Sequence, residues 1–147
     1  MKQVHLVVGI LSVALMGGAG LWGAWCWYTT RQSRLFWRLL RAGQAVVVLE
    51  IALGGIWVLM GRGEPKLHLI YGLLPLLVSF FAEQLRIAAA QMVLDKRGFE
   101  SSADVGELPA PEQRAVVVAI LQRELGVMVL AALVIVVLLI RAAGTGG

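Results

Sequence analysis

The chain has 147 residues, of which 59% are hydrophobic and only 15% are charged, and its mean hydropathy is +0.82. Such a composition excludes an ordinary soluble domain and predicts an integral membrane protein. The net charge of +4 does not indicate nucleic-acid binding, because the basic residues stand at the ends of apolar stretches, where they orient membrane helices.

Four apolar stretches come near the length needed to cross a bilayer, since about 20 residues of helix span about 30 Å of hydrocarbon. We expect spans at about residues 4–27, 43–60, 68–94 and 116–140, with a cytoplasmic loop at about 95–115. The predicted fold is an all-α integral membrane protein with a single four-helix transmembrane domain over residues 1–147. It would be a multi-pass protein of the inner or plasma membrane.

The basic residues predict the orientation. Lys2 is the only charge before the first span, whereas the connection after it carries Arg31, Arg34, Arg38 and Arg41. By the positive-inside rule this connection is cytoplasmic, so both termini should be extracytoplasmic. The alternative is that the first stretch is a cleaved secretory signal, but the four arginines after it would then have to be translocated.

The third stretch is too long for one crossing, and we expect the third and fourth helices to extend into the cytoplasm. Counted from the outer ends, Glu83 and Arg86 fall at about the depth of Arg123 and Glu124. This predicts ion pairs between the two helices, while the alternative is that each charge reaches separately to water. Between them, the serines, glycines and acidic residues of 98–106 are typical of a flexible loop.

The only two histidines open two similar heptapeptides, His5–Leu11 and His68–Leu74, at the outer ends of the first and third helices. Each has a glycine four residues further on, Gly9 and Gly72, on the same helix face, which leaves room for a flat ligand. Two imidazoles at one depth can bind one iron from opposite sides, so we expect a haem b with His5 and His68 as axial ligands. The alternative is that each histidine simply sits among the lipid headgroups.

Basic residues near the outer surface could neutralise the haem propionates. Arg62 is the first candidate, followed by Lys66 and Lys2. A carboxyl group in the middle of the second span, Glu50, is costly in hydrocarbon. It could lie near the haem edge or carry protons, or it could hydrogen-bond to a residue such as Gln44 or Ser79.

The stretch from His5 to about residue 75 resembles half of a haem A synthase, a family in which each half is a four-helix bundle. The most specific part is the segment Gln44–Leu59 with its Leu-Gly-Gly sequence, followed by a short outer turn and His68. The resemblance implies that His5 and His68 are axial ligands of one haem. The family's oxygenating half uses an acidic residue in an outer loop that precedes its first ligand helix, and only four residues precede His5. We therefore do not expect haem A synthesis by this chain.

A bis-histidine haem has no open axial position, so the sequence favours a cytochrome b-like protein for electron transfer or haem handling. The alternative is a non-catalytic structural or assembly subunit of a larger membrane complex, which leaves the histidine pair unexplained. Besides the bilayer, the partners consistent with either function are a second copy of the chain or a larger membrane complex. No soluble small-molecule substrate is indicated.

Overall fold

The computed structural model describes residues 2–61 and 65–146 of the chain. By length and composition, its four long helices could each cross a membrane: α1 (Lys2–Tyr28), α2 (Arg34–Leu59), α3 (Lys66–Lys96) and α5 (Ala110–Thr145). A fifth helix, α4 (Ser102–Gly106), is only five residues long and lies between α3 and α5 in the chain. The described ranges contain no strand, so the predicted all-helical fold with four candidate spans is confirmed.

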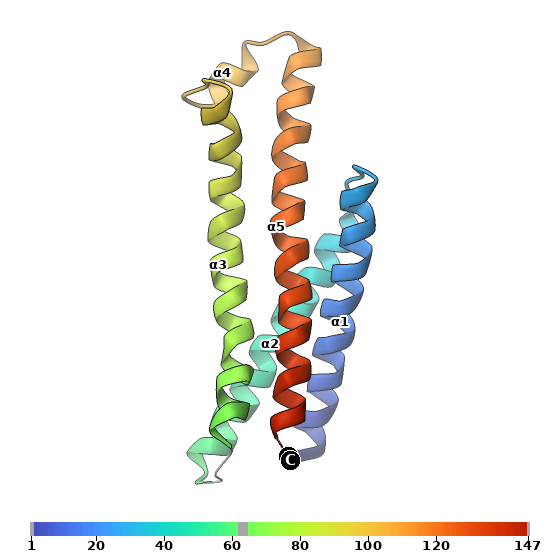
Figure 1. Cartoon of the computed structure of the whole chain (residues 1–147), viewed down its shortest axis with the longest axis vertical. Helices are drawn as coiled ribbons and strands as arrows, with labels where there is room; N and C mark the ends of the chain where they lie inside the picture. Colours follow the sequence, from blue (N-terminus) through green and yellow to red (C-terminus); the bar gives the residue numbers. More distant parts are fainter. Residues whose placement is uncertain (1, 62–64, 147) are drawn as a thin grey trace.

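Three of the long helices form a layer, and the remaining one crosses it. Figure 1 shows α1, α5 and α3 side by side, with α2 running diagonally from one end of α1 to the opposite end of α3. α5 packs against both α1 and α3, whereas α2 packs mainly on α1 and touches α3 little. The start of α1, the end of α2, the start of α3 and the end of α5 meet at one end, which carries His5 and His68 and is called the histidine end below.

At the other end, α3 and α5 continue well past α1 and α2, as the sequence predicted (Figure 1). α4 lies in the segment predicted to be a flexible loop, and the difference has a local cause. The Ser101 side chain caps α4 and the Asp104 carboxylate accepts from the Ser101 backbone, a reciprocal capping box. Val105 then packs against Leu94 and Val116, so α4 closes the tip of the α3–α5 pair.

α2 is longer than its apolar stretch. It begins at Arg34 rather than at about residue 43, because the Ser33 side chain accepts a hydrogen bond from the backbone of Phe36 and starts the helix. Phe36 and Leu40 are fully buried although they stand among arginines. The arginines lower the hydropathy of this segment and hide its buried face from a search for apolar spans.

α1 and α2 run antiparallel along a seam in which a large side chain meets a glycine every seven residues. A Cβ atom at Gly23 would lie 2.5 Å from the Phe36 ring, and a Cβ atom at Gly43 would lie 2.5 Å from the sulfur of Met16. The backbones can approach closely only because these glycines carry no side chain. The seam therefore fixes the register of the two helices.

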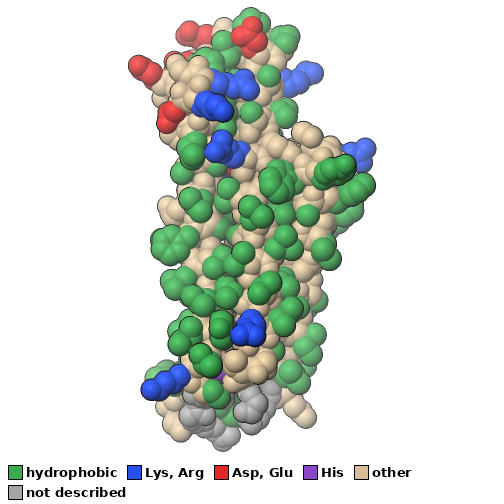
Figure 2. All heavy atoms as spheres, viewed as in Figure 1, with side chains coloured by type: hydrophobic (Ala, Val, Ile, Leu, Met, Phe, Trp, Pro, Cys, Tyr) green, Lys and Arg blue, Asp and Glu red, His purple; other side chains and the backbone are tan. Residues whose placement is uncertain are grey.

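Ion pairs join three helices where the α3–α5 extension begins. The Glu83 carboxylate on α3 accepts hydrogen bonds from Arg41 of α2 and from Arg86, and Arg86 also lies 3.7 Å from Glu124 of α5. The predicted ion pairing between the third and fourth spans is thus confirmed for Arg86 and Glu124. Figure 2 shows acidic and basic side chains together at the end away from the histidines. Below them is a broad apolar surface, with isolated basic side chains near the histidine end.

Candidate functional site

The two histidines lie next to each other although 62 residues separate them in the sequence. Their ring centroids are 6.0 Å apart and the ring planes are inclined by 69°. Both rings are half-buried. This proximity arises because α1 and α3 both begin at the histidine end, and His5 and His68 stand in the first turns of their helices.

The spacing of the rings suits a single metal ion between them. With metal–nitrogen bonds of about 2.0–2.1 Å, imidazoles on opposite sides of one ion have centroids about 6 to 6.5 Å apart. No group of three or more His, Cys, Asp and Glu side chains among the described residues could hold a metal ion. The donor set therefore fits an ion whose remaining ligands come from a macrocycle better than it fits a bare zinc or copper ion.

A backbone carbonyl fixes the orientation of one ring. Nδ1 of His68 lies 2.9 Å from the carbonyl oxygen of Ala142 in the last part of α5. Because a carbonyl oxygen can only accept, Nδ1 carries a proton, and in the neutral ring Nε2 is then the nitrogen with the lone pair. Metal-binding histidines are commonly held in this way by a second partner. Nδ1 of His5, in contrast, is buried and has no hydrogen-bond partner among the described residues.

A cavity of about 1130 Å³ opens beside the two rings. All four long helices contribute to its wall, which is apolar apart from the histidines and Glu50. Both glycines predicted to leave room for a ligand line it, and a Cβ atom at Gly72 would meet nothing within 4 Å. At Gly9 the space is taken by the Glu50 side chain, whose Oε1 would lie 2.6 Å from an added Cβ atom.

Two further glycines pack against the rings themselves. A Cβ atom at Gly54 would lie 3.6 Å from the His5 ring, and one at Gly146 would lie 2.7 Å from Nδ1 of His68. The bare backbone at these positions lets α2 approach the first ring and α5 approach the second. His5 is thus backed by a glycine of α2, and His68 by the glycine that directly follows α5.

Glu50 belongs to this site, and the partners considered for it from the sequence are wrong. Gln44 instead donates to Glu83 and accepts from Arg41, and the buried hydroxyl of Ser79 has no hydrogen-bond partner among the described residues. Glu50 lines the same cavity as both histidines, and its carboxylate also lies close to the Ser12 hydroxyl. Its Oε2 atom is buried and likewise lacks a partner within the described part of the chain.

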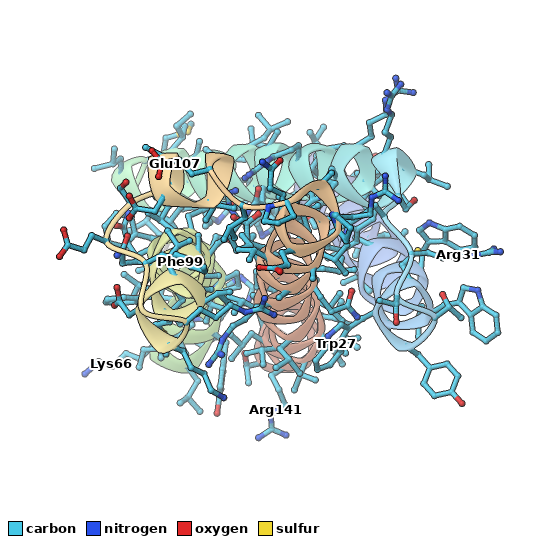
Figure 3. The ribbon with its side chains drawn as sticks, turned by 90° about the horizontal axis from the view of Figure 1, so that it is seen from above. Trp27, Arg31, Lys66, Phe99, Glu107 and Arg141 are labelled. Atoms are coloured by element: carbon cyan, nitrogen blue, oxygen red, sulfur yellow. The ribbon has the colours of Figure 1, made fainter. Side chains whose placement is uncertain are left out.

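The cations predicted to meet propionates differ in where they lie. Arg62 falls outside the described residues, as does the side chain of Lys2. Lys66 is exposed and points away from the bundle in Figure 3. Arg141, a further cation near the histidine end, points outward there too, with its guanidinium 5.7 Å from the Tyr71 ring centroid.

Sequence reasoning found the histidine pair and the two glycines of the cavity wall, and it missed the contacts that hold the two rings. The Ala142 carbonyl leaves no trace in the sequence, because any residue could supply it. Gly146 stands in the glycine-rich segment Gly144-Thr145-Gly146-Gly147, which indicates no packing role. Gly54 could have been found from its spacing. It follows the polar residue Glu50 by four positions on α2, as Gly9 follows His5 on α1.

No protein-family model, curated protein or solved structure matches the chain.

Proposed function

We propose that this protein is a membrane haem-binding protein in which His5 and His68 ligate one haem b from opposite sides. The observation that carries the proposal is the 6.0 Å separation of the only two imidazole rings of the chain, at the edge of a largely apolar cavity of about 1130 Å³. The arrangement would follow that of the haem A synthase half-bundles that residues 5 to about 75 resemble.

The proposed orientation places the histidine end at the extracytoplasmic face. Arg31 lies in the connection between α1 and α2, and Arg34, Arg38 and Arg41 lie in the first turns of α2. This is the end of the two helices that lies away from the histidines. Cytoplasmic connections are rich in such residues. The extension formed by α3, α4 and α5 would then project into the cytoplasm, and the protein would be a multi-pass protein of the inner or plasma membrane.

The residues of the site favour electron transfer or haem handling. A haem supplies one-electron redox chemistry, and with both axial positions filled it offers no open site to oxygen. His68 would bind through Nε2, because its Nδ1 atom donates to Ala142. The apolar wall would exclude water from the ring, and the exposed Lys66 side chain, which points away from the bundle in Figure 3, would have to turn inward to reach the propionates.

The proposal is tested by absorbance spectroscopy of the detergent-solubilised protein after expression with a haem supply. We expect a Soret band and the split, sharpened visible bands of a six-coordinate haem on reduction. His5→Ala and His68→Ala should each abolish or strongly reduce the bound haem. Val7→Ala is the matched control, because Val7 stands two residues after His5 on the same helix, is 62% exposed and lies outside the cavity wall.

A wild-type protein that binds no haem, or a His68→Ala variant with an unchanged spectrum, would overturn the proposal. If the colourless wild type also co-purified in fixed stoichiometry with other membrane proteins, the result would favour the structural or assembly subunit instead.

A further inference from the structure

Two buried polar groups of the cavity each have an atom without a partner. Nδ1 of His5 and Oε2 of Glu50 form no hydrogen bond to any described residue. Leaving a polar atom unpaired in an apolar interior is unfavourable, and more so for a charged group. The Ser12 hydroxyl lies close enough to the Glu50 carboxylate to hydrogen-bond with it, but it also donates to the Val8 carbonyl, 3.0 Å away, and its single proton cannot serve both acceptors fully.

The register of α1 and α2 places these two groups one helical turn apart. His5 packs against Gly54, and Glu50 packs against Gly9. In each helix the glycine follows the polar residue by four positions, which is about one turn. Because α1 and α2 are antiparallel, the contact of His5 with Gly54 and the contact of Glu50 with Gly9 therefore lie one turn apart along the same seam. One helical turn is about 5.4 Å, a distance that a glutamate side chain bridges by a change of rotamer.

Packing alone does not account for an acid at position 50. Glu50 over Gly9 continues the series of large side chains over glycines on the α1–α2 seam, after Phe36 and Met16. The earlier two are apolar and fully buried, as expected for a contact between helices in hydrocarbon. A leucine or methionine would fill the third place without the cost of a carboxyl group within a membrane span, so Glu50 needs a polar partner to explain it.

We propose that Glu50 is the positioning residue of His5: its carboxylate accepts the Nδ1 proton of His5, as the Ala142 carbonyl accepts that of His68. This inference rests on the proposed function, because the hydrogen bond would leave Nε2 of both rings for the iron. It makes the two axial ligands unequal, since a carboxylate partner raises the electron donation of an imidazole more than a carbonyl does. His5 would therefore stabilise the oxidised iron.

The test compares Glu50→Leu and Glu50→Gln in the haem-loaded protein. Loss of a second partner of this kind typically weakens metal binding about 10–100-fold, and we expect this from Glu50→Leu, which keeps the bulk over Gly9. Glu50→Gln keeps an acceptor oxygen without the charge, so it should restore most of the affinity while the midpoint potential stays above that of the wild type. The readouts are the haem dissociation constant and a potentiometric titration.

Glu83→Gln is the matched control, because it makes the same chemical change on α3, in the ion-pair cluster and outside the cavity wall. It should leave both haem affinity and potential unchanged. A Glu50→Leu variant with wild-type affinity and wild-type potential would overturn the role of Glu50.

A second measurement needs no haem and separates this inference from the proposed function. A double-mutant cycle of His5→Ala and Glu50→Leu is followed by thermal unfolding of the cofactor-free protein in detergent. Non-additive shifts of the unfolding midpoint would support a direct interaction even if no haem were bound. Additive shifts in a protein that binds no haem would overturn it.

Discussion

The His68 ring lies against the backbone of Gly146, at the point where an added Cβ atom would stand 2.7 Å from Nδ1. The same ring nitrogen donates to the carbonyl of Ala142, four residues earlier on α5. The end of α5 therefore holds a candidate ligand that belongs to another helix. This contact can be tested without altering the histidine.

Gly146→Val should displace the His68 ring and weaken haem binding, since the new side chain must occupy the space of the imidazole. Gly144→Val is the control, because a Cβ atom at Gly144 meets nothing within 4 Å. We expect at least a several-fold faster loss of haem to an apomyoglobin acceptor for the first variant and no change for the second. Equal rates would show that α5 does not position His68.

The seam between α1 and α2 predicts opposite effects for two glycines of one helix. Gly23→Ala should destabilise the protein by about 1–3 kcal/mol, because its Cβ atom would overlap the Phe36 ring and Val129 in a closely packed region. Gly18→Ala meets nothing within 4 Å and should be neutral or stabilising by up to about 1 kcal/mol, since alanine favours helix. Unfolding in detergent with increasing denaturant measures both, and a neutral Gly23→Ala would contradict the close approach of the two helices.

The ion-pair cluster predicts a loss of stability without a loss of haem. Glu83→Leu removes the acceptor shared by Arg41, Gln44 and Arg86, and hydrogen bonds to charged groups contribute about 1.5–3 kcal/mol each when they are shielded from water. The carboxylate is 25% exposed, so we expect a total near the lower end of this range. Unfolding measurements check the value, with the exposed Glu100→Leu as control. A Soret band altered by Glu83→Leu would show that the cluster and the cavity are coupled.

The proposed orientation is tested by labelling single cysteines in intact cells. Cys26 is 2% exposed and is first replaced by serine to give a background without thiols. A membrane-impermeant maleimide should then label Thr145→Cys at the histidine end, while Ser102→Cys at the tip of the extension should react only after the cells are opened. The reverse pattern would place the histidines in the cytoplasm and contradict the proposed orientation.

The sequence predicted the four long helices and the proximity of His5 and His68, because both follow from the lengths and the order of the apolar segments. Apolar length predicts a candidate span, and alternation of helix direction brings the starts of the first and third helices to the same end. The boundary at Arg34 was missed, since a side-chain cap and buried side chains, rather than mean hydropathy, decide where α2 begins.

Contacts between helices could not be predicted in the same way. Gln44 could have been excluded as a partner from the sequence, because it stands six residues before Glu50 on the same helix and on a different face. That Glu50 faces Gly9, in contrast, depends on the register of α1 against α2, which the large-over-glycine seam sets through Phe36 and Met16. No single one of these residues carries that information. It appears only when both helices are laid side by side, and for this reason the contact between Glu50 and Gly9 was missed while the histidine pair was found.

α5 is one unbroken helix of 36 residues, about 54 Å long, that begins beside α4 and ends against His68. A continuous helix is stiff along its axis, so its two ends cannot shift independently. Whatever fixes the far tip of the α3–α5 pair therefore also sets where the Ala142 carbonyl stands, and with it the direction in which the His68 ring points.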